Sequence, residues 1–135
     1  MASKSNTNSN STVWTYNGTT YKAIGTGYDS VYSMAILGGP DATGNYINID
    51  LNSHPGVSGV FNVVSSRLDL GTGSSNCTVS VGNNNSAYGY GTVGKTGDKV
   101  NLTVSGGRYS ATFSNITITN GTDTTTVSGT VAEDK

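Results

Sequence analysis

The stretch VWTYNGTTYKAI at residues 13–24 decides the fold class. It contains two short segments of alternating side chains, Val13–Tyr16 and Thr19–Ile24, on either side of the dipeptide Asn17-Gly18. Alternation with a period of two places successive side chains on opposite faces of a β-strand, and Asn-Gly is the strongest short signal for a two-residue hairpin turn. The stretch therefore predicts an antiparallel hairpin.

The same pattern recurs along the rest of the chain. In NYINIDL, which begins at residue 45, Ile47, Ile49 and Leu51 share one face, and Asn48 and Asp50 share the other. Residues 28–37, 57–64, 76–81, 87–93, 99–105, 109–119 and 124–131 also read as strands, separated by turns rich in Gly, Asn and Ser. Short connections favour antiparallel neighbours, and one open sheet this apolar would leave a face exposed. We therefore predict an all-β fold, an antiparallel β-sandwich or an up-and-down barrel of about nine or ten strands.

The alternation breaks once, near residue 114. Ala111 and Phe113 share a face, but Ile116 and Ile118 fall on the opposite parity. A slip of one residue would turn both isoleucines to solvent. The sequence therefore predicts a β-bulge near Ser114–Asn115, where one extra residue restores the apolar face.

The chain of 135 residues fits one domain, which we place at residues 13–131. Residues 1–12 lack the apolar centre of a signal peptide. We interpret Met1-Ala2-Ser3 as a translation start that takes the place of a removed signal peptide. The polar residues that follow, up to residue 12, are expected to form a flexible tether. Residues 132–135 are expected to be frayed. The formal net charge is −1 and there is no basic cluster, which argues against nucleic-acid binding. The charge-poor composition, rich in Ser, Thr, Asn and Gly, is typical of secreted and surface proteins, so we expect an extracytoplasmic location.

Three motifs occur in a characteristic order: WTYNGTTY at 14–21, GVF at 59–61 and VSGTV at 127–131. This order resembles that of small, largely uncharacterised secreted lipoprotein β-domains of Bacteroidetes type. The resemblance implies attachment to a membrane only through a lipid on a cysteine ahead of a polar linker. It implies no catalytic residue.

The sequence contains no catalytic signature. His54, in a His-Pro-Gly turn, is expected to be an exposed loop residue, and one histidine with one distant cysteine makes neither a zinc site nor a dyad. Cys77 is expected to be a small buried strand residue. The carboxylate pair that glycoside hydrolysis would need, Asp50 and Asp69, is interpreted as two solvated strand charges. We therefore predict that the protein is not an enzyme.

Two loops combine aspartate with asparagine: Asp41 with Asn45, and Asp123 with Asn120. Calcium takes six to eight oxygen ligands, and neither loop has the spacing of an EF-hand. We interpret both as Asx turns and expect no metal and no cofactor.

Aromatic residues give the strongest indication of a binding function. Tyr88 and Tyr90 lie on one face of a predicted strand with Gly89 between them, and Trp14 and Tyr16 are spaced in the same way. Such a face can stack a sugar ring, although the same aromatics could instead cover the core or pair across strands. We therefore expect a non-enzymatic secreted or surface-attached domain that binds carbohydrate or serves as an adhesive or structural module.

Two other functions stay open. One is a lipocalin-like barrel that holds a small apolar ligand, and the other is a small hydrolase. The expected partner is a glycan or another protein. Strand edges with few Lys or Pro residues also leave self-association open.

Overall fold

The computed structural model describes residues 12–31, 34–52, 56–64, 68, 70, 75–82, 87–90, 98–119 and 124–134. These residues form strands and turns and no α-helix, so the all-β class is confirmed. None of them forms a helix that is long and apolar enough to span a membrane. The strands are β1 Val13–Tyr16, β2 Thr19–Lys22, β3 Gly27–Val31, β4 Met34–Pro40, β5 Tyr46–Leu51, β6 Gly59–Val63, β7 Asn76–Gly82, β8 Ala87–Tyr90, β9 Lys99–Ser105, β10 Arg108–Thr119 and β11 Thr124–Ala132.

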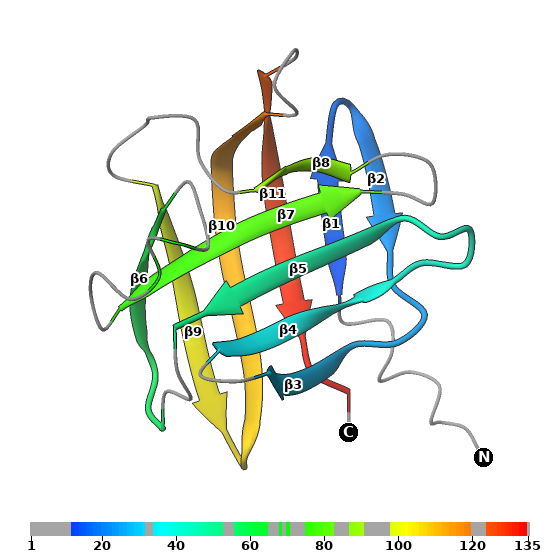
Figure 1. Ribbon diagram of the computed structural model, residues 1–135. Helices are drawn as coiled ribbons and strands as arrows, with labels where there is room; N and C mark the ends of the chain where they lie inside the picture. Colours follow the sequence, from blue (N-terminus) through cyan, green and yellow to red (C-terminus); the bar gives the residue numbers. More distant parts are fainter. Residues whose placement is uncertain are drawn as a thin grey trace, which may run out of the picture.

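All eleven strands belong to one sheet, in the order β2-β1-β11-β10-β9-β6-β7-β5-β4-β3, with β8 beside β7. The sheet curls into a half-barrel, so that β3, β4, β5 and β7 cross in front of β9, β10, β11 and β1 (Figure 1). Among the described residues, every strand pairing is antiparallel except that of β6 with β7. The connection between Val63 and Asn76 has about the dozen residues that a parallel crossover needs. The sequence prediction of short connections did not anticipate this parallel pair.

The core lies between the two crossing layers. Ile47, Ile49 and Leu51 of β5 have no exposed surface, as their shared face predicts. The other face of β5 differs from expectation: Asp50 is also 0% exposed, and its carboxylate accepts a hydrogen bond of 3.2 Å from the Thr78 hydroxyl. Thr78 lies directly opposite Asp50 on β7 and is itself buried. The interpretation of Asp50 as a solvated charge is therefore wrong. Asp69 lies outside the described residues.

The predicted bulge in β10 is confirmed. The register of β10 against β11 shifts between Phe113 and Ile116. Asn115 adopts a φ of 54°, and its backbone N–H donates to Ser128 Oγ over 2.8 Å instead of joining the regular ladder. The extra residue returns Ile116 and Ile118 to the core, with 0% and 1% exposure.

The chain between β2 and β3 turns a corner of the half-barrel. The Ile24 N–H donates to the carbonyl of Pro40 at the end of β4, over 2.9 Å. This segment passes very close to β4, because a Cβ built on Gly39 would lie 1.8 Å from the carbonyl oxygen of Gly25. The absence of a side chain at Gly39 therefore permits the crossing.

The C-terminal residues tie the same corner to the opposite layer. The Thr26 N–H donates to Asp134 Oδ2 over 2.8 Å, and the Asp134 N–H donates to the Thr26 carbonyl over 3.0 Å. The Tyr109 N–H donates to Glu133 Oε1 over 3.1 Å. The expectation of a frayed tail is therefore wrong for residues 132–134, because backbone and carboxylate groups of the tail complete the pairing of strand ends.

Candidate functional site

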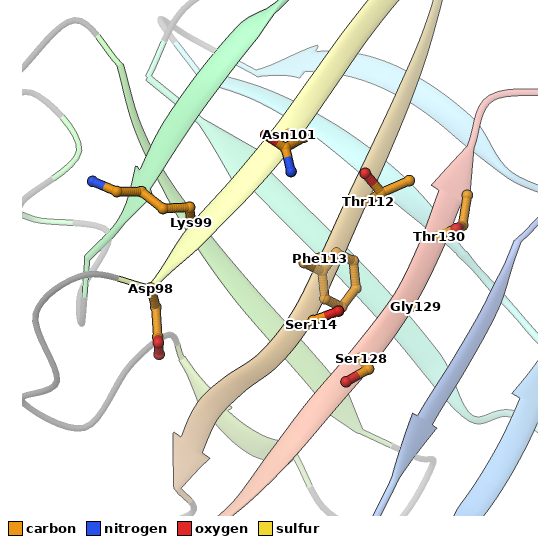
Figure 2. Close-up of a pocket in the computed structure, with 9 residues that line it drawn as sticks. All are labelled: Asp98, Lys99, Asn101, Thr112, Phe113, Ser114, Ser128, Gly129 and Thr130. Atoms are coloured by element: carbon orange, nitrogen blue, oxygen red, sulfur yellow. The ribbon is translucent and has the colours of Figure 1, made fainter.

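The outer face of the half-barrel is hollowed where β9, β10 and β11 run side by side (Figure 2). The hollow has a volume of about 600 Å³. Most of its lining side chains are uncharged hydroxyls and amides, and most are exposed or half-buried. The lining residues are Asp98, Lys99, Asn101, Thr112, Phe113, Ser114, Ser128, Gly129 and Thr130.

The hollow forms because β10 leaves β9 at the bulge. Asn101 and Thr112 are the last pair at that end of the β9–β10 ladder, and beyond them β10 has no partner on β9. Asp98 fills the gap: its Oδ2 accepts a hydrogen bond of 3.0 Å from the Thr117 N–H. The carbonyl of Asp98 accepts another, also 3.0 Å, from the Val63 N–H. Asp98 therefore fixes the start of β9 to β6 and to the part of β10 that follows the bulge.

A row of three polar side chains crosses the hollow. Asn101 on β9 pairs with Thr112 on β10, and Thr112 pairs with Thr130 on β11. Side chains paired in this way stand roughly 5 Å apart on one face of a sheet. Each of the three both donates and accepts hydrogen bonds. The row can therefore contact several polar groups of one extended ligand.

Lys99 and the residues at the floor of the hollow are less available to a ligand. Lys99 points away toward β6, where its Nζ donates to Asn62 Oδ1 (Figure 2). Phe113 and Gly129 lie opposite each other at the floor, and Phe113 is only 5% exposed because its ring belongs to the core. A ligand in the hollow therefore meets polar side chains and backbone and no exposed aromatic ring.

The structure places Trp14 and Tyr16 in the core. They are 0% and 6% exposed, and both rings stack on Tyr21, with centroid separations of 5.5 Å and 5.4 Å. A sugar that arrives from solvent cannot reach either ring. The prediction of a binding face at these two residues is therefore corrected in favour of its alternative, in which the aromatics cover the core.

Tyr88 and Tyr90 lie in β8, whose backbone pairs with Val81 and Ser80 of β7. The structure describes only the backbone of these two residues, so the prediction that they bind a ligand stays a prediction. His54, Asn120 and Asp123 also lie outside the described residues.

The loop at Asp41 is an Asx turn. Oδ1 of Asp41 accepts hydrogen bonds of 2.9 Å from the N–H groups of Thr43 and Asn45, and Oδ2 accepts one of 2.8 Å from the Asn45 amide. Burial alone would raise the pKa of Asp41, but these hydrogen bonds outweigh it and lower the pKa below its ordinary value. The carboxylate is thus satisfied by its own loop.

Cys77 is buried and free, as predicted. Burial, together with the nearby charge of Asp50, raises the pKa of its thiol to about 12. In the part of the chain that the structure describes, no three His, Cys, Asp or Glu side chains come close enough to hold a metal ion.

The row formed by Asn101, Thr112 and Thr130 was not predictable from the sequence, because these residues meet only through strand register. One signal was available: the predicted bulge, since bulges occur often beside binding sites. No family model, curated protein or solved structure matches this chain.

Proposed function

We propose that the protein is a non-enzymatic carbohydrate-binding domain that acts outside the cytoplasm, secreted or attached to a surface. The observation that carries this proposal is the hollow of about 600 Å³ on the outer face of β9, β10 and β11. Its size suits a short stretch of a glycan chain. Its lining of amide and hydroxyl side chains suits a ligand that is rich in hydroxyl groups.

The chemistry of the lining supports a sugar over other ligands. A sugar hydroxyl both donates and accepts hydrogen bonds, and Asn101, Thr112 and Thr130 do the same. A nucleic acid would require a cluster of cations, whereas the only cation in the lining, Lys99, is engaged with Asn62. The lack of exposed rings among the lining residues implies recognition by hydrogen bonding, not by stacking.

The lipocalin-like alternative receives less support. Its ligand would occupy the interior, where the described residues place a cluster of buried side chains that includes Trp14, Phe61 and Phe113. The charge-poor composition supports a location outside the cytoplasm, and a glycan on a cell surface or in a matrix is the partner that such a location offers.

A glycan array followed by isothermal titration calorimetry tests the proposal. Thr112→Val and Thr130→Val remove one hydroxyl each with little change of shape, and each should weaken binding about fivefold, as expected for one hydrogen bond. Thr103→Val is the matched control, because Thr103 is exposed on β9 outside the hollow. Failure of the wild-type protein to bind any glycan would refute the proposal. Full loss of binding in Tyr88→Ala or Tyr90→Ala, with Thr112→Val unaffected, would move the site to β8.

A further inference from the structure

We infer that Asp98 makes the hollow selective for uncharged glycans, with its carboxylate accepting a hydrogen bond from a sugar hydroxyl. This inference rests on the proposed function and concerns the same site. Asp98 supplies the only carboxylate among the nine lining residues.

The carboxylate of Asp98 is fixed in place, but only one of its two oxygens, Oδ2, accepts a hydrogen bond from the described part of the protein. Asp98 is 9% exposed, so its position is set by packing as well as by the hydrogen bond from the Thr117 N–H to Oδ2. Among the described residues, that bond is the one hydrogen bond its side chain makes, and Oδ1 is not among the buried atoms without a partner. Because Asp98 lines the hollow, Oδ1 is the carboxylate oxygen that is left to accept a hydrogen bond from a ligand.

The backbone contact through Oδ2 also orients the carboxylate. Figure 2 shows it extending from the start of β9 toward the part of β10 beyond the bulge. Asp98 lies three positions before Asn101 along the chain and lines the same hollow, so a ligand that contacts Asn101 and extends along β9 meets this carboxylate at one edge of the hollow. A hydrogen bond from a sugar hydroxyl to an ionised carboxylate is shorter and roughly twice as strong as one between neutral groups.

The same negative charge disfavours acidic sugars. Lys99, the one cation in the lining, donates to Asn62 and points toward β6, so its ammonium group does not pair with the carboxylate of Asp98. A uronic acid would bring a second carboxylate next to Asp98, and two like charges in a partly desolvated site repel each other. Attraction of hydroxyl donors and repulsion of anions therefore act together to give selectivity.

The experiment compares neutral glucan, mannan and galactan oligosaccharides with their C6-oxidised uronic counterparts, by calorimetry on the full chain. We expect the wild-type protein to prefer the neutral member of the bound pair by at least about tenfold. Asp98→Asn keeps an oxygen that can accept from the Thr117 N–H but removes the charge. It should lose about tenfold in affinity for the neutral sugar and should lose the preference.

Two further variants keep the test decisive if Asp98→Asn proves unstable. Asn101→Asp adds a second carboxylate to the hollow without touching the contact to Thr117, and it should strengthen the rejection of uronic sugars. Asp29→Asn removes the same charge from an exposed position on β3 and should change nothing. Equal binding of neutral and acidic sugars by the wild-type protein, or an unchanged preference in Asp98→Asn and Asn101→Asp, overturns the inference and leaves the proposed function intact. Absence of binding to both sugar classes overturns the proposed function itself.

Discussion

Trp14 on β1 lies directly opposite Gly129 on β11, and the two backbones approach so closely that only glycine fits. A Cβ built on Gly129 would lie 2.8 Å from Trp14 Cα and 2.3 Å from the carbonyl oxygen of Val13. The indole has no exposed surface and stacks on Tyr21 of β2. Gly129 thus brings β1 close to β11 while its other face contributes to the floor of the hollow.

Gly129→Ala should therefore destabilise the protein by about 2–4 kcal/mol, because the atoms that the new methyl group meets are mainly backbone and cannot move aside. Chemical denaturation of the wild-type protein and the variant measures the difference. Gly59→Ala is the control, since a Cβ at Gly59 meets nothing within 4 Å. Equal stability of the two variants would show that the close approach of β1 to β11 is not required.

The bulge gives a second prediction. Asn115 has a φ of 54°, a conformation that asparagine and glycine tolerate and that β-branched residues avoid. Asn115→Val should cost about 1–3 kcal/mol in unfolding free energy, whereas Asn115→Gly should stay close to the wild type. Because the bulge shapes the hollow, Asn115→Val should also weaken glycan binding in calorimetry. A fully stable Asn115→Val protein would mean that β10 pairs with β11 without the bulge.

The sequence predicted those features that depend on the order of residues within one strand. Parity along β5 identified Ile47, Ile49 and Leu51 as a core face, and the change of parity before Ile116 located the bulge. Both predictions follow from the period of two, which a strand obeys wherever it lies in the sheet.

Features that depend on which strands become neighbours were not predictable in this way. Alternation placed Asp50 opposite the core face, but it could not show that Thr78, 28 positions later, would become its neighbour on β7 and donate a hydrogen bond to it. Trp14 and Tyr16 shared a face, and only the curl of the sheet shows that this face is the inner one. The candidate site was not predictable for the same reason, because only strand register brings Asn101 and Thr130 to either side of Thr112.

Cys77 supplies a prediction about pH. Its pKa is about 12 in the folded protein, because of burial and the charge of Asp50, against about 8.5 in an unfolded chain. The folded state therefore holds the proton more tightly, and the thiol does not affect stability below pH 8.5 but lowers it increasingly as pH rises toward 12. Between pH 8.5 and 10, the free energy of unfolding of the wild type should fall by about 2 kcal/mol relative to Cys77→Ala.

Denaturation of both proteins across this pH range measures the effect, and the Cys77→Ala protein accounts for every other titrating group. Labelling gives an independent readout, since the thiolate is the reactive form. A thiol reagent at pH 8 should leave the native protein unmodified and should react fully in guanidinium chloride. Parallel pH curves for the two proteins, or rapid labelling of the native state, would contradict the assignment of Cys77 to the closed core.

The contact between Asp134 and Thr26 gives the last prediction. Asp134→Ala removes the acceptor of the Thr26 N–H, a bond of 2.8 Å, and leaves this backbone donor at a buried residue without its partner. The loss should be about 1–3 kcal/mol, the cost of an unsatisfied buried group. Asp134→Asn retains an oxygen that can accept this bond and should lose less. Because the contact ties the corner between β2 and β3 to the end of β11, hydrogen exchange at the Thr26 amide should accelerate more than exchange at the central strands β5 and β7. If Asp134→Ala leaves Thr26 as protected as before, then the backbone bonds from the Asp134 N–H to Thr26 and from the Ile24 N–H to Pro40 are enough to hold the corner.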